Sequence, residues 1–305
     1  MSLVDSKYEI YSHGRKPKRW YSFFDEEEYR VKPNQSEGKK WYHWFHEDDT
    51  REEKILLFKL DLILAFYSFI IYWIKYMDQT NLNNAYVSGM KQALHMEGND
   101  LVNVQVMYTI GDAVFQVPFS ILFPHVRMDL LLPTFDIAWG LFTLAQYKAT
   151  STQELMAFRF LVGMSEAAFF PGVLYLFGCF YKSHEINRRL GIFYLGNMLG
   201  SLTVGLMQAS IYKHLNGRNG LQGWQYLYIV NAAITIPVGF LGFIIWPGTP
   251  SKLHSIFLTK REGELILNRI QKSGIAGPKG FNKRTIIKAL TNWHFYAIVS
   301  IAIFS

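Results

Sequence analysis

Residues Arg159–Gly172 read RFLVGMSEAAFFPG, and they lie inside a long apolar run that extends from Leu155 to Phe180. An apolar run of about 20 residues has the length of a helix that crosses a bilayer. This run nevertheless carries two charged side chains, Arg159 and Glu166, whose burial in hydrocarbon is costly. Seven residues of α-helix make nearly two turns, so both side chains are expected on one face, about 10.5 Å apart along the axis. The stretch therefore predicts a membrane helix with a polar face turned towards the interior of a helix bundle.

Other apolar runs of similar length lie on both sides of this stretch. Of the 305 residues, 50% are apolar or aromatic and only 18% are Asp, Glu, Lys or Arg, against about 25% in a typical soluble domain. Lipid offers no partner for free backbone groups, so single apolar runs must cross it as helices. The sequence therefore predicts an all-α membrane protein with six spans, at 56–77, 101–123, 130–148, 154–177, 191–212 and 224–246.

The charged residues divide the chain into four parts. We expect an N-terminal tail at 1–55, a six-helix transmembrane bundle at 56–246, a connector at 247–290 and the start of a seventh transmembrane helix at 291–305. The tail repeats a basic, aromatic and acidic order, at Lys18–Glu26 and at Lys39–Glu47, which suits either an anionic membrane surface or a solvated segment. In the connector, Lys260–Gln271 predicts a short charged helix on the membrane surface.

The basic residues of the loops predict the orientation in the membrane. They are concentrated after the second, fourth and sixth spans, at Arg127, Lys182, Arg188 and Arg189 and along 247–290. Loops rich in Lys and Arg face the cytoplasm, so the N-terminus and the connector are expected on that side of what we interpret as the plasma membrane. Because the basic residues lie mostly in loops between apolar spans, the net charge of +7 does not indicate nucleic acid as a partner.

Short motifs follow one another in a characteristic order along residues 55–270. They are Lys59–Asp61, Asp78–Asn81, Asn84–Ala85, Gly89–Met90, Arg159–Leu161, Gly163, Glu166–Ala167, Phe170–Gly172, Tyr181, Glu185, Arg188–Arg189, Gly223–Trp224 and Phe257–Thr259. Taken together, this series resembles the fungal anion:cation symporters of the major facilitator superfamily, the group of allantoate and vitamin permeases. The N-terminal segment and Ser88–Lys91 look most like the branch of biotin and sulfur-compound permeases.

The resemblance implies the N-terminal half of a twelve-helix transporter, built as two three-helix repeats and followed by the start of helix seven. It also implies proton-coupled import of a small organic anion, such as a vitamin or a sulfur- or nitrogen-containing carboxylate. The partners would then be protons, the lipid bilayer and a second six-helix half. The sequence departs from the family at Gln79, where the relatives usually have an arginine that is associated with the anionic substrate.

Three charged residues are the main candidates for coupling and binding. Glu166 is interpreted as the proton carrier, with a structural hydrogen bond to a neighbouring helix as the alternative. Asp78 is expected at the end of the first span, either paired with Arg159 and involved in proton coupling or exposed as a loop acid. Arg159 is interpreted as a gating or substrate-binding residue, because guanidinium groups bind carboxylates bidentately, or it snorkels to the outer interface.

Polar residues at helical spacing complete the predicted substrate site. Gln105, Asp112 and Gln116 fall at i, i+7 and i+11, a stripe that either lines a cavity or makes a polar contact between helices. Gln79, Asn81 and Asn197 are further candidates. Tyrosines 72, 108 and 175 present hydroxyls to a substrate or belong to the core. Gly196-x-x-x-Gly200 predicts close packing of two helices within the chain, with dimerisation as the alternative.

The sequence also bounds the class of function. It contains no GxSxG, P-loop or HExxH motif, so an enzyme is not expected. No cofactor and no metal are expected, because Cys179 is the only cysteine and every histidine falls outside the predicted spans. Two functions remain: a proton-coupled symporter, or a truncated, non-transporting or split half-transporter that needs a second chain.

Overall fold

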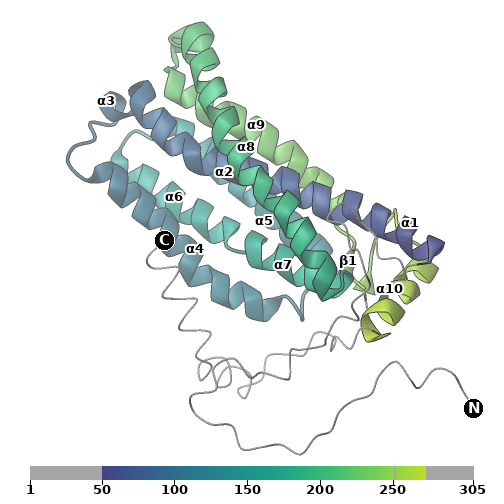
Figure 1. Cartoon of the computed structure of the whole chain (residues 1–305). Helices are drawn as coiled ribbons and strands as arrows, with labels where there is room; N and C mark the ends of the chain where they lie inside the picture. The colour runs from purple at the N-terminus through teal and green to yellow at the C-terminus, as the bar shows by residue number, and fades with distance from the viewer. Residues whose placement is uncertain (1–49, 251, 273–305) are drawn as a thin grey trace, which may run out of the picture. The chain divides into compact units, whose positions relative to one another are not determined.

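The computed structural model describes residues 50–250 and 252–272 (Figure 1). Three predicted parts lie outside the described residues: the N-terminal tail up to residue 49, the connector beyond residue 272 and the seventh helix at 291–305.

The first membrane helix is longer than the predicted span 56–77. It begins with a capping box, in which Thr50 and Glu53 each accept a hydrogen bond from the other's backbone N–H. Gly89, with a φ of 109°, kinks the chain near its end. Asp78 therefore lies inside this helix and is fully buried. Its expected place at the end of the span is wrong, and so is the alternative of an exposed loop acid. The segments are α1 (Arg51–Leu60), η3 (Asp61–Phe66), α2 (Tyr67–Ala85), η4 (Tyr86–Met90) and α3 (Lys91–Ala93).

The later helices follow the predicted order. They are α4 (Asp100–Leu122), α5 (Met128–Ala145), η5 (Gln146–Lys148), α6 (Thr152–Glu166), α7 (Phe169–Phe180), α8 (Ser183–Leu215), η6 (Arg218–Gly220) and α9 (Gly223–Ile245). In the connector, β1 (Gly248–Thr249) pairs antiparallel with β2 (Lys252–Leu253), and α10 (Lys260–Lys272) follows. The short helix predicted at Lys260–Gln271 is thus confirmed as α10.

The predicted fourth span, 154–177, is broken into two helices. α6 ends at Glu166, and α7 begins at Phe169. Pro171 has no backbone N–H, so the carbonyl of Ala167, four residues earlier, lacks its helical donor. The break therefore follows Glu166 directly and leaves that residue at the C-terminal end of α6.

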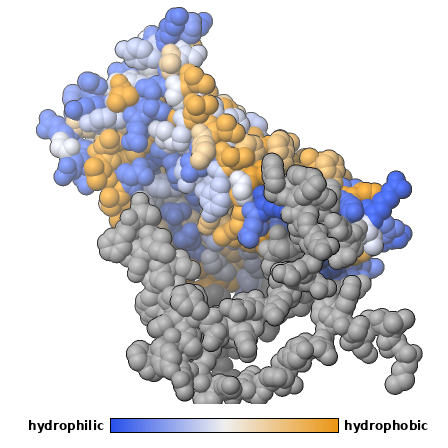
Figure 2. Space-filling model, viewed as in Figure 1, coloured by the Kyte–Doolittle hydropathy of each residue, from blue (hydrophilic) through white to orange (hydrophobic). Residues whose placement is uncertain are grey.

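Five helical segments within the described residues are long and apolar enough to cross a membrane: Arg51–Ala93, Met128–Lys148, Thr152–Phe180, Glu185–Leu215 and Gly223–Ile245. α4 coincides with the predicted span 101–123 but is not among them, although it has 23 residues. Asn103, Gln105 and Asp112 lower its mean hydropathy. Figure 2 shows hydrophobic residues along the middle of the visible face and hydrophilic residues gathered at the two ends of the bundle.

Helix pairing in the bundle follows a twofold pattern. α2 packs on α8, α4 packs on α6, and α5 packs on α9. The first three membrane helices (α2, α4, α5) can be exchanged in order for the last three (α6–α7, α8, α9). The α2–α8 pair then becomes the α4–α6 pair, and the α5–α9 pair is unchanged. This arrangement is the one expected of two three-helix repeats.

Glycines permit the closest of these approaches. A Cβ on Gly200 of α8 would lie 2.6 Å from the carbonyl oxygen of Trp73 in α2, and one on Gly196 would lie 2.9 Å from the Trp73 nitrogen. On the symmetry-related pair, Gly111 of α4 and Gly163 of α6 each face the backbone of the other helix. The predicted intramolecular packing of Gly196 and Gly200 is therefore confirmed.

Candidate functional site

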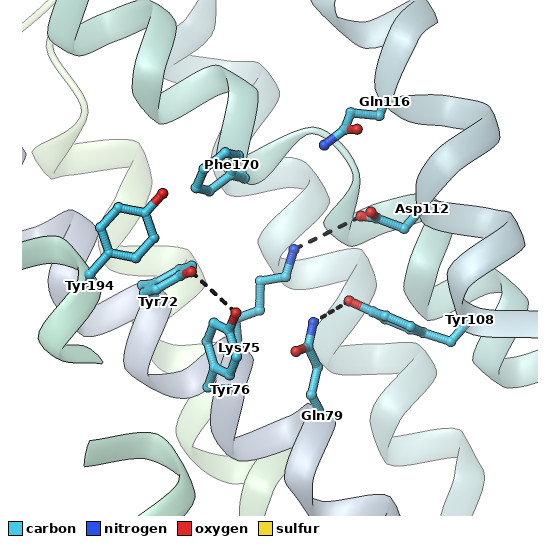
Figure 3. A pocket seen from close by; sticks show the side chains of 9 residues that line it. All are labelled: Tyr72, Lys75, Tyr76, Gln79, Tyr108, Asp112, Gln116, Phe170 and Tyr194. Atoms are coloured by element: carbon cyan, nitrogen blue, oxygen red, sulfur yellow. Dashed lines mark hydrogen bonds and ion pairs between the residues drawn. The ribbon is translucent and has the colours of Figure 1, made fainter. Parts of the chain in front are cut away.

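A pocket of about 370 Å³ lies between α2, α4, α7 and α8 (Figure 3). One side of the pocket is polar and the other is aromatic, and its volume falls within the range of about 300–1,000 Å³ typical of small-molecule sites. Its lining residues are Tyr72, Lys75, Tyr76, Gln79, Tyr108, Asp112, Gln116, Phe170 and Tyr194. The pocket can therefore hold a small molecule that has a polar and an apolar part.

Lys75 is the one cation among the lining residues. Its ammonium lies 3.6 Å from Oε2 of Glu166 and 3.9 Å from Oδ1 of Asp112, and it donates a long hydrogen bond of 3.5 Å to the backbone carbonyl of Glu166. A cation at this position also suits the C-terminal end of α6. Lys75 was not among the site residues predicted from the sequence, although it is the only basic residue between Asp61 and Asp78 in an apolar run. That is the same signal that singled out Arg159.

Glu166 lies beside the pocket and is 1% exposed. Its Oε2 accepts a hydrogen bond of 2.6 Å from the hydroxyl of Tyr108, and Gln79 donates to that same hydroxyl. Its other oxygen, Oε1, is buried without a hydrogen-bond partner among the described residues. The charged and titratable groups around Glu166 are Lys75 and Asp78 on α2, Tyr108 and Asp112 on α4, Asp136 on α5 and Arg159 on α6. Glu166 is thus linked to the pocket through Tyr108 and Lys75.

Arg159 and Asp78 form a buried ion pair outside the pocket lining. Nη1 of Arg159 lies 3.6 Å from Oδ2 of Asp78, and the two residues are 1% and 0% exposed. The predicted pairing across helices is therefore confirmed, and the interpretation of Arg159 as a snorkelling residue is wrong. Asp78 also accepts hydrogen bonds from Asn231 (2.6 Å), Trp139 (3.3 Å) and Thr143 (3.3 Å), and Arg159 donates to the hydroxyl of Tyr228 (3.4 Å).

The other predicted site residues fall into two groups. Gln79, Asp112 and Gln116 line the pocket, and so do Tyr72 and Tyr108. Gln105, Asn81, Asn197 and Tyr175 are not among the lining residues. Gln105 lies two turns from Asp112 on an exposed part of α4, and Asn81 is fully buried one turn beyond Asp78. The polar stripe on α4 therefore reaches the pocket only through its last two members.

Asp136 of α5 is a further buried acid that the sequence analysis missed. It is 3% exposed, and its Oδ2 has no hydrogen-bond partner among the described residues. It interacts electrostatically with Glu166 and Lys75. Asp136 is the one acidic residue in the predicted span 130–148, so the signal was present in the sequence. Despite these buried acids, no group of three or more His, Cys, Asp or Glu side chains in the described ranges could hold a metal ion.

A second group of ion pairs lies at the end of the bundle where α10 and α1 are found (Figure 1). Lys59 and Asp61, both near the start of the first helix, each bind a different helix. The pairs are Lys59–Glu262 (2.6 Å), Arg189–Asp61 (2.5 Å), Arg269–Glu185 (2.5 Å) and Arg269–Glu53 (3.5 Å). These contacts join α10 and the start of α8 to the first helix.

Comparison with family models decides the family of this bundle. A model described as "Major Facilitator Superfamily" matches residues 68–305. The chain belongs to the major facilitator superfamily.

Several major facilitator proteins of fungi are similar in sequence. The "Vitamin H transporter" of Saccharomyces cerevisiae is 42% identical over 276 residues, which cover 89% of this chain and 46% of that protein. The "Pantothenate transporter FEN2" of the same yeast is 37% identical over 251 residues, covering 80% and 49%. The "Pantothenate transporter liz1" of Schizosaccharomyces pombe is 34% identical over 257 residues, covering 83% and 49%. The chain thus spans about half the length of the curated relatives it matches.

Solved major facilitator structures share the fold. A bacterial homologue of the human lysosomal transporter Spinster, in an inward-facing and occupied conformation, superposes with a TM-score of 0.54 at 16% identity, covering 61% of this chain and 44% of that chain. The predicted fold class, the N-terminal half of a major facilitator bundle, is confirmed. The chain is an integral membrane protein whose named relatives are transporters and not enzymes.

Proposed function

We propose that this chain forms the substrate- and proton-binding half of a proton-coupled symporter that imports a small organic anion. One observation carries the proposal: Glu166 is fully buried, lies beside a small-molecule pocket and is in reach of both Lys75 and the Tyr108 hydroxyl. The names of the relatives support a vitamin carboxylate as the substrate.

Glu166 has two ways to be stable inside the membrane. As a carboxylate it has the Lys75 ammonium at 3.6 Å, and as a neutral acid it needs no cation. A proton carrier requires a group that can be accommodated in both states. Lys75 has a second carboxylate, Asp112, at 3.9 Å, so it keeps an ionic partner when Glu166 takes up a proton.

Asp78 and Arg159 are better placed for gating and coupling than for direct contact with substrate. Their ion pair joins α2 to α6, and the Asn231 and Tyr228 contacts add α9. If α2 moved relative to these helices, the contacts of this network would either break or move together with α2. We propose that it couples occupancy of the pocket to the opening and closing of the site.

The pocket would be completed by a second six-helix half, since the matched relatives are about twice as long as the chain. In this fold, substrate sites lie between the two halves near the middle of the membrane, and the halves rock around them. We place the protein in the plasma membrane, and the basic loops support a cytoplasmic N-terminus. The length of the match equally supports a half-transporter that needs a second chain, and expression of the chain with and without such a partner separates the two.

Uptake measurements test the proposal. The protein that carries this chain is produced in cells that cannot make vitamin H or pantothenate, and labelled uptake is followed as external pH and a protonophore are varied. We expect uptake at acidic external pH that a protonophore abolishes. Glu166→Gln should reduce accumulation at least about tenfold, the loss expected when a required proton site is removed, while exchange of substrate across the membrane continues.

Glu154→Gln is the matched control, because Glu154 is exposed in the first turn of the same helix. It should leave uptake and its pH dependence unchanged. Uptake by Glu166→Gln that remains fully sensitive to the protonophore would contradict the assigned role of Glu166.

A further inference from the structure

We infer that Lys75 is the residue that binds the substrate's carboxylate. In this step the substrate's carboxylate replaces that of Glu166 as the ionic partner of Lys75. The pocket would thereby select amphipathic carboxylates, with the acid group against Lys75 and the apolar body against the aromatic wall. The inference rests on the proposed function and deepens it, because it names the residue that decides the substrate class.

Lys75 has unused hydrogen-bonding capacity. An ammonium has three donors, and within the described residues the only hydrogen bond of Lys75 is the 3.5 Å contact with the carbonyl of Glu166. Both carboxylates lie beyond ordinary hydrogen-bond distance, at 3.6 Å and 3.9 Å. Figure 3 shows the ammonium directed between α2 and α4, towards Asp112. Two strong donor positions are therefore available to a ligand in the pocket.

The balance of charge at the pocket depends on the protonation of Glu166. Lys75, Asp112 and Glu166 carry one positive and two negative charges when all three are ionised, so a ligand carboxylate meets a net charge of −1. Protonation of Glu166 removes one negative charge and frees Lys75 from one of its partners. An anion then enters a site of zero net charge instead of a repelling one. This exchange ties the binding of an anion to the binding of a proton.

The opposite wall of the pocket is aromatic. Tyr72 lies with its ring centroid 4.8 Å from Tyr76, 5.9 Å from Tyr194 and 6.4 Å from Phe170. Aromatic faces of this kind bury the apolar part of a ligand without requiring hydrogen bonds from it. The polar and aromatic walls together orient a carboxylate with an apolar body in one direction only.

Arg159 is the competing candidate for the same task, and its surroundings exclude it. Its guanidinium is held by Asp78 and Tyr228, it is 1% exposed, and it does not line the pocket. A substrate could reach it only after the buried pair with Asp78 had been broken. Lys75 lines the pocket already and needs no such rearrangement.

Ligand binding to the purified full protein tests the inference without relying on transport. Thermal stabilisation is measured with vitamin H and its carboxamide, and with pantothenate and the corresponding alcohol. We expect the wild type to bind each acid at least about tenfold more tightly than its neutral analogue, as charge-assisted bonds to a carboxylate require. Lys75→Gln should remove this preference by weakening the acid alone, and Lys75→Arg should retain it.

Two further variants keep the result interpretable. Lys91→Gln removes a positive charge from the exposed α3 segment that ends the first membrane helix, and it should leave the preference intact. Lys75→Gln combined with Asp112→Asn preserves the net charge of the site should the single variant fail to fold, and it too should lose the preference for acids.

A wild-type acid preference in Lys75→Gln, or in Lys75→Gln combined with Asp112→Asn, would overturn the inference. So would a wild-type protein that binds acids no better than their neutral analogues. The proposed function is judged separately, by uptake that depends on a proton gradient. Proton-driven uptake with an unchanged acid preference in Lys75→Gln would therefore refute the role of Lys75 alone.

Discussion

The guanidinium of Arg159 lies 3.6 Å from the carboxylate of Asp78, and neither side chain has appreciable access to solvent. The two residues are far apart in the chain, on α6 and α2, and their contact holds these two helices together in the interior of the bundle. Breaking a buried pair by removing one partner leaves an uncompensated charge, which is more costly than losing the pair as a whole.

Asp78→Ala should therefore destabilise the protein by about 3–5 kcal/mol, because Arg159 would remain buried without its counter-ion. Thermal unfolding in detergent measures the effect. Adding Arg159→Met to Asp78→Ala should recover a large part of the lost stability. If the double variant is no more stable than the single one, the ion pair is not the source of the loss.

Asp136→Asn should behave in the opposite way. Asp136 is also buried, yet its Oδ2 has no hydrogen-bond partner among the described residues, so replacing the carboxyl with an amide breaks no observed hydrogen bond. We expect a melting temperature equal to or above that of the wild type, since burying an ionised carboxylate costs more than burying a neutral amide. A clear drop in melting temperature, comparable with that of Asp78→Ala, would show that Asp136 has an essential partner.

Gly200→Ala should weaken the packing of α8 on α2. The added Cβ would lie 2.6 Å from the carbonyl oxygen of Trp73, so the helices must move apart. Gly205→Ala is the matched control, because it lies on the same helix and its Cβ would meet nothing within 4 Å. The control should be neutral or slightly stabilising, by up to about 1 kcal/mol, since alanine favours helix over glycine. Equal melting temperatures for the two variants would refute the close approach.

Arg269→Ala should detach α10 from the bundle. Arg269 is 3% exposed, with Nη2 2.5 Å from Glu185 and Nε 3.5 Å from Glu53. Arg261→Ala is the control, because Arg261 is exposed and meets Glu52 at 3.4 Å on the surface, where ion pairs contribute little. Hydrogen exchange of residues 260–272 reports the outcome. Faster exchange is expected for Arg269→Ala only, and protection unchanged in that variant would contradict the prediction.

The contact between α1 and α10 should also depend on pH. Partial burial raises the pKa of Glu262, but hydrogen bonds from Lys59 and Thr259 outweigh it and hold the pKa below its usual 4.5. A lowered folded pKa contributes stability that is present above the unfolded value and lost as pH falls through the folded one. The protection factors of α10, which correct for the slower intrinsic exchange at acidic pH, should therefore fall below about pH 4.5, and Glu262→Gln should reduce that change. If the pH response of Glu262→Gln is identical to that of the wild type, acids other than Glu262 cause the response.

Much of the fold follows from residue patterns that act locally. The apolar runs predict the membrane helices, and the glycines at 196 and 200 predict a close helix contact that the structure confirms against Trp73. Boundaries were less predictable. The first helix continues through Asp78 to Ala85. There the buried carboxylate of Asp78 accepts hydrogen bonds from Asn231, Trp139 and Thr143, and no signal within the first span reveals these partners.

The candidate site, like the fold, could be predicted from the sequence only in part. Charged residues in apolar runs identify Arg159, Asp78 and Glu166, and the same rule applied throughout would have found Lys75 and Asp136. The partners of these charges could not be read from the chain. Arg159 and Glu166 share a helix, yet one meets Asp78 and the other meets Lys75, because successive turns of α6 face different parts of α2.

The sequence by itself determined that this protein crosses the membrane as helices, since lipid leaves the backbone of an apolar run no other stable form. It also determined that a few buried charges must exist, because those residues cannot leave their spans. Only the tertiary structure decided which charges meet. Ion pairing depends on distances of a few ångströms between helices remote in the chain, and these are set by close contacts such as Gly200 against Trp73. That packing leaves Lys75 at the pocket and Arg159 away from it.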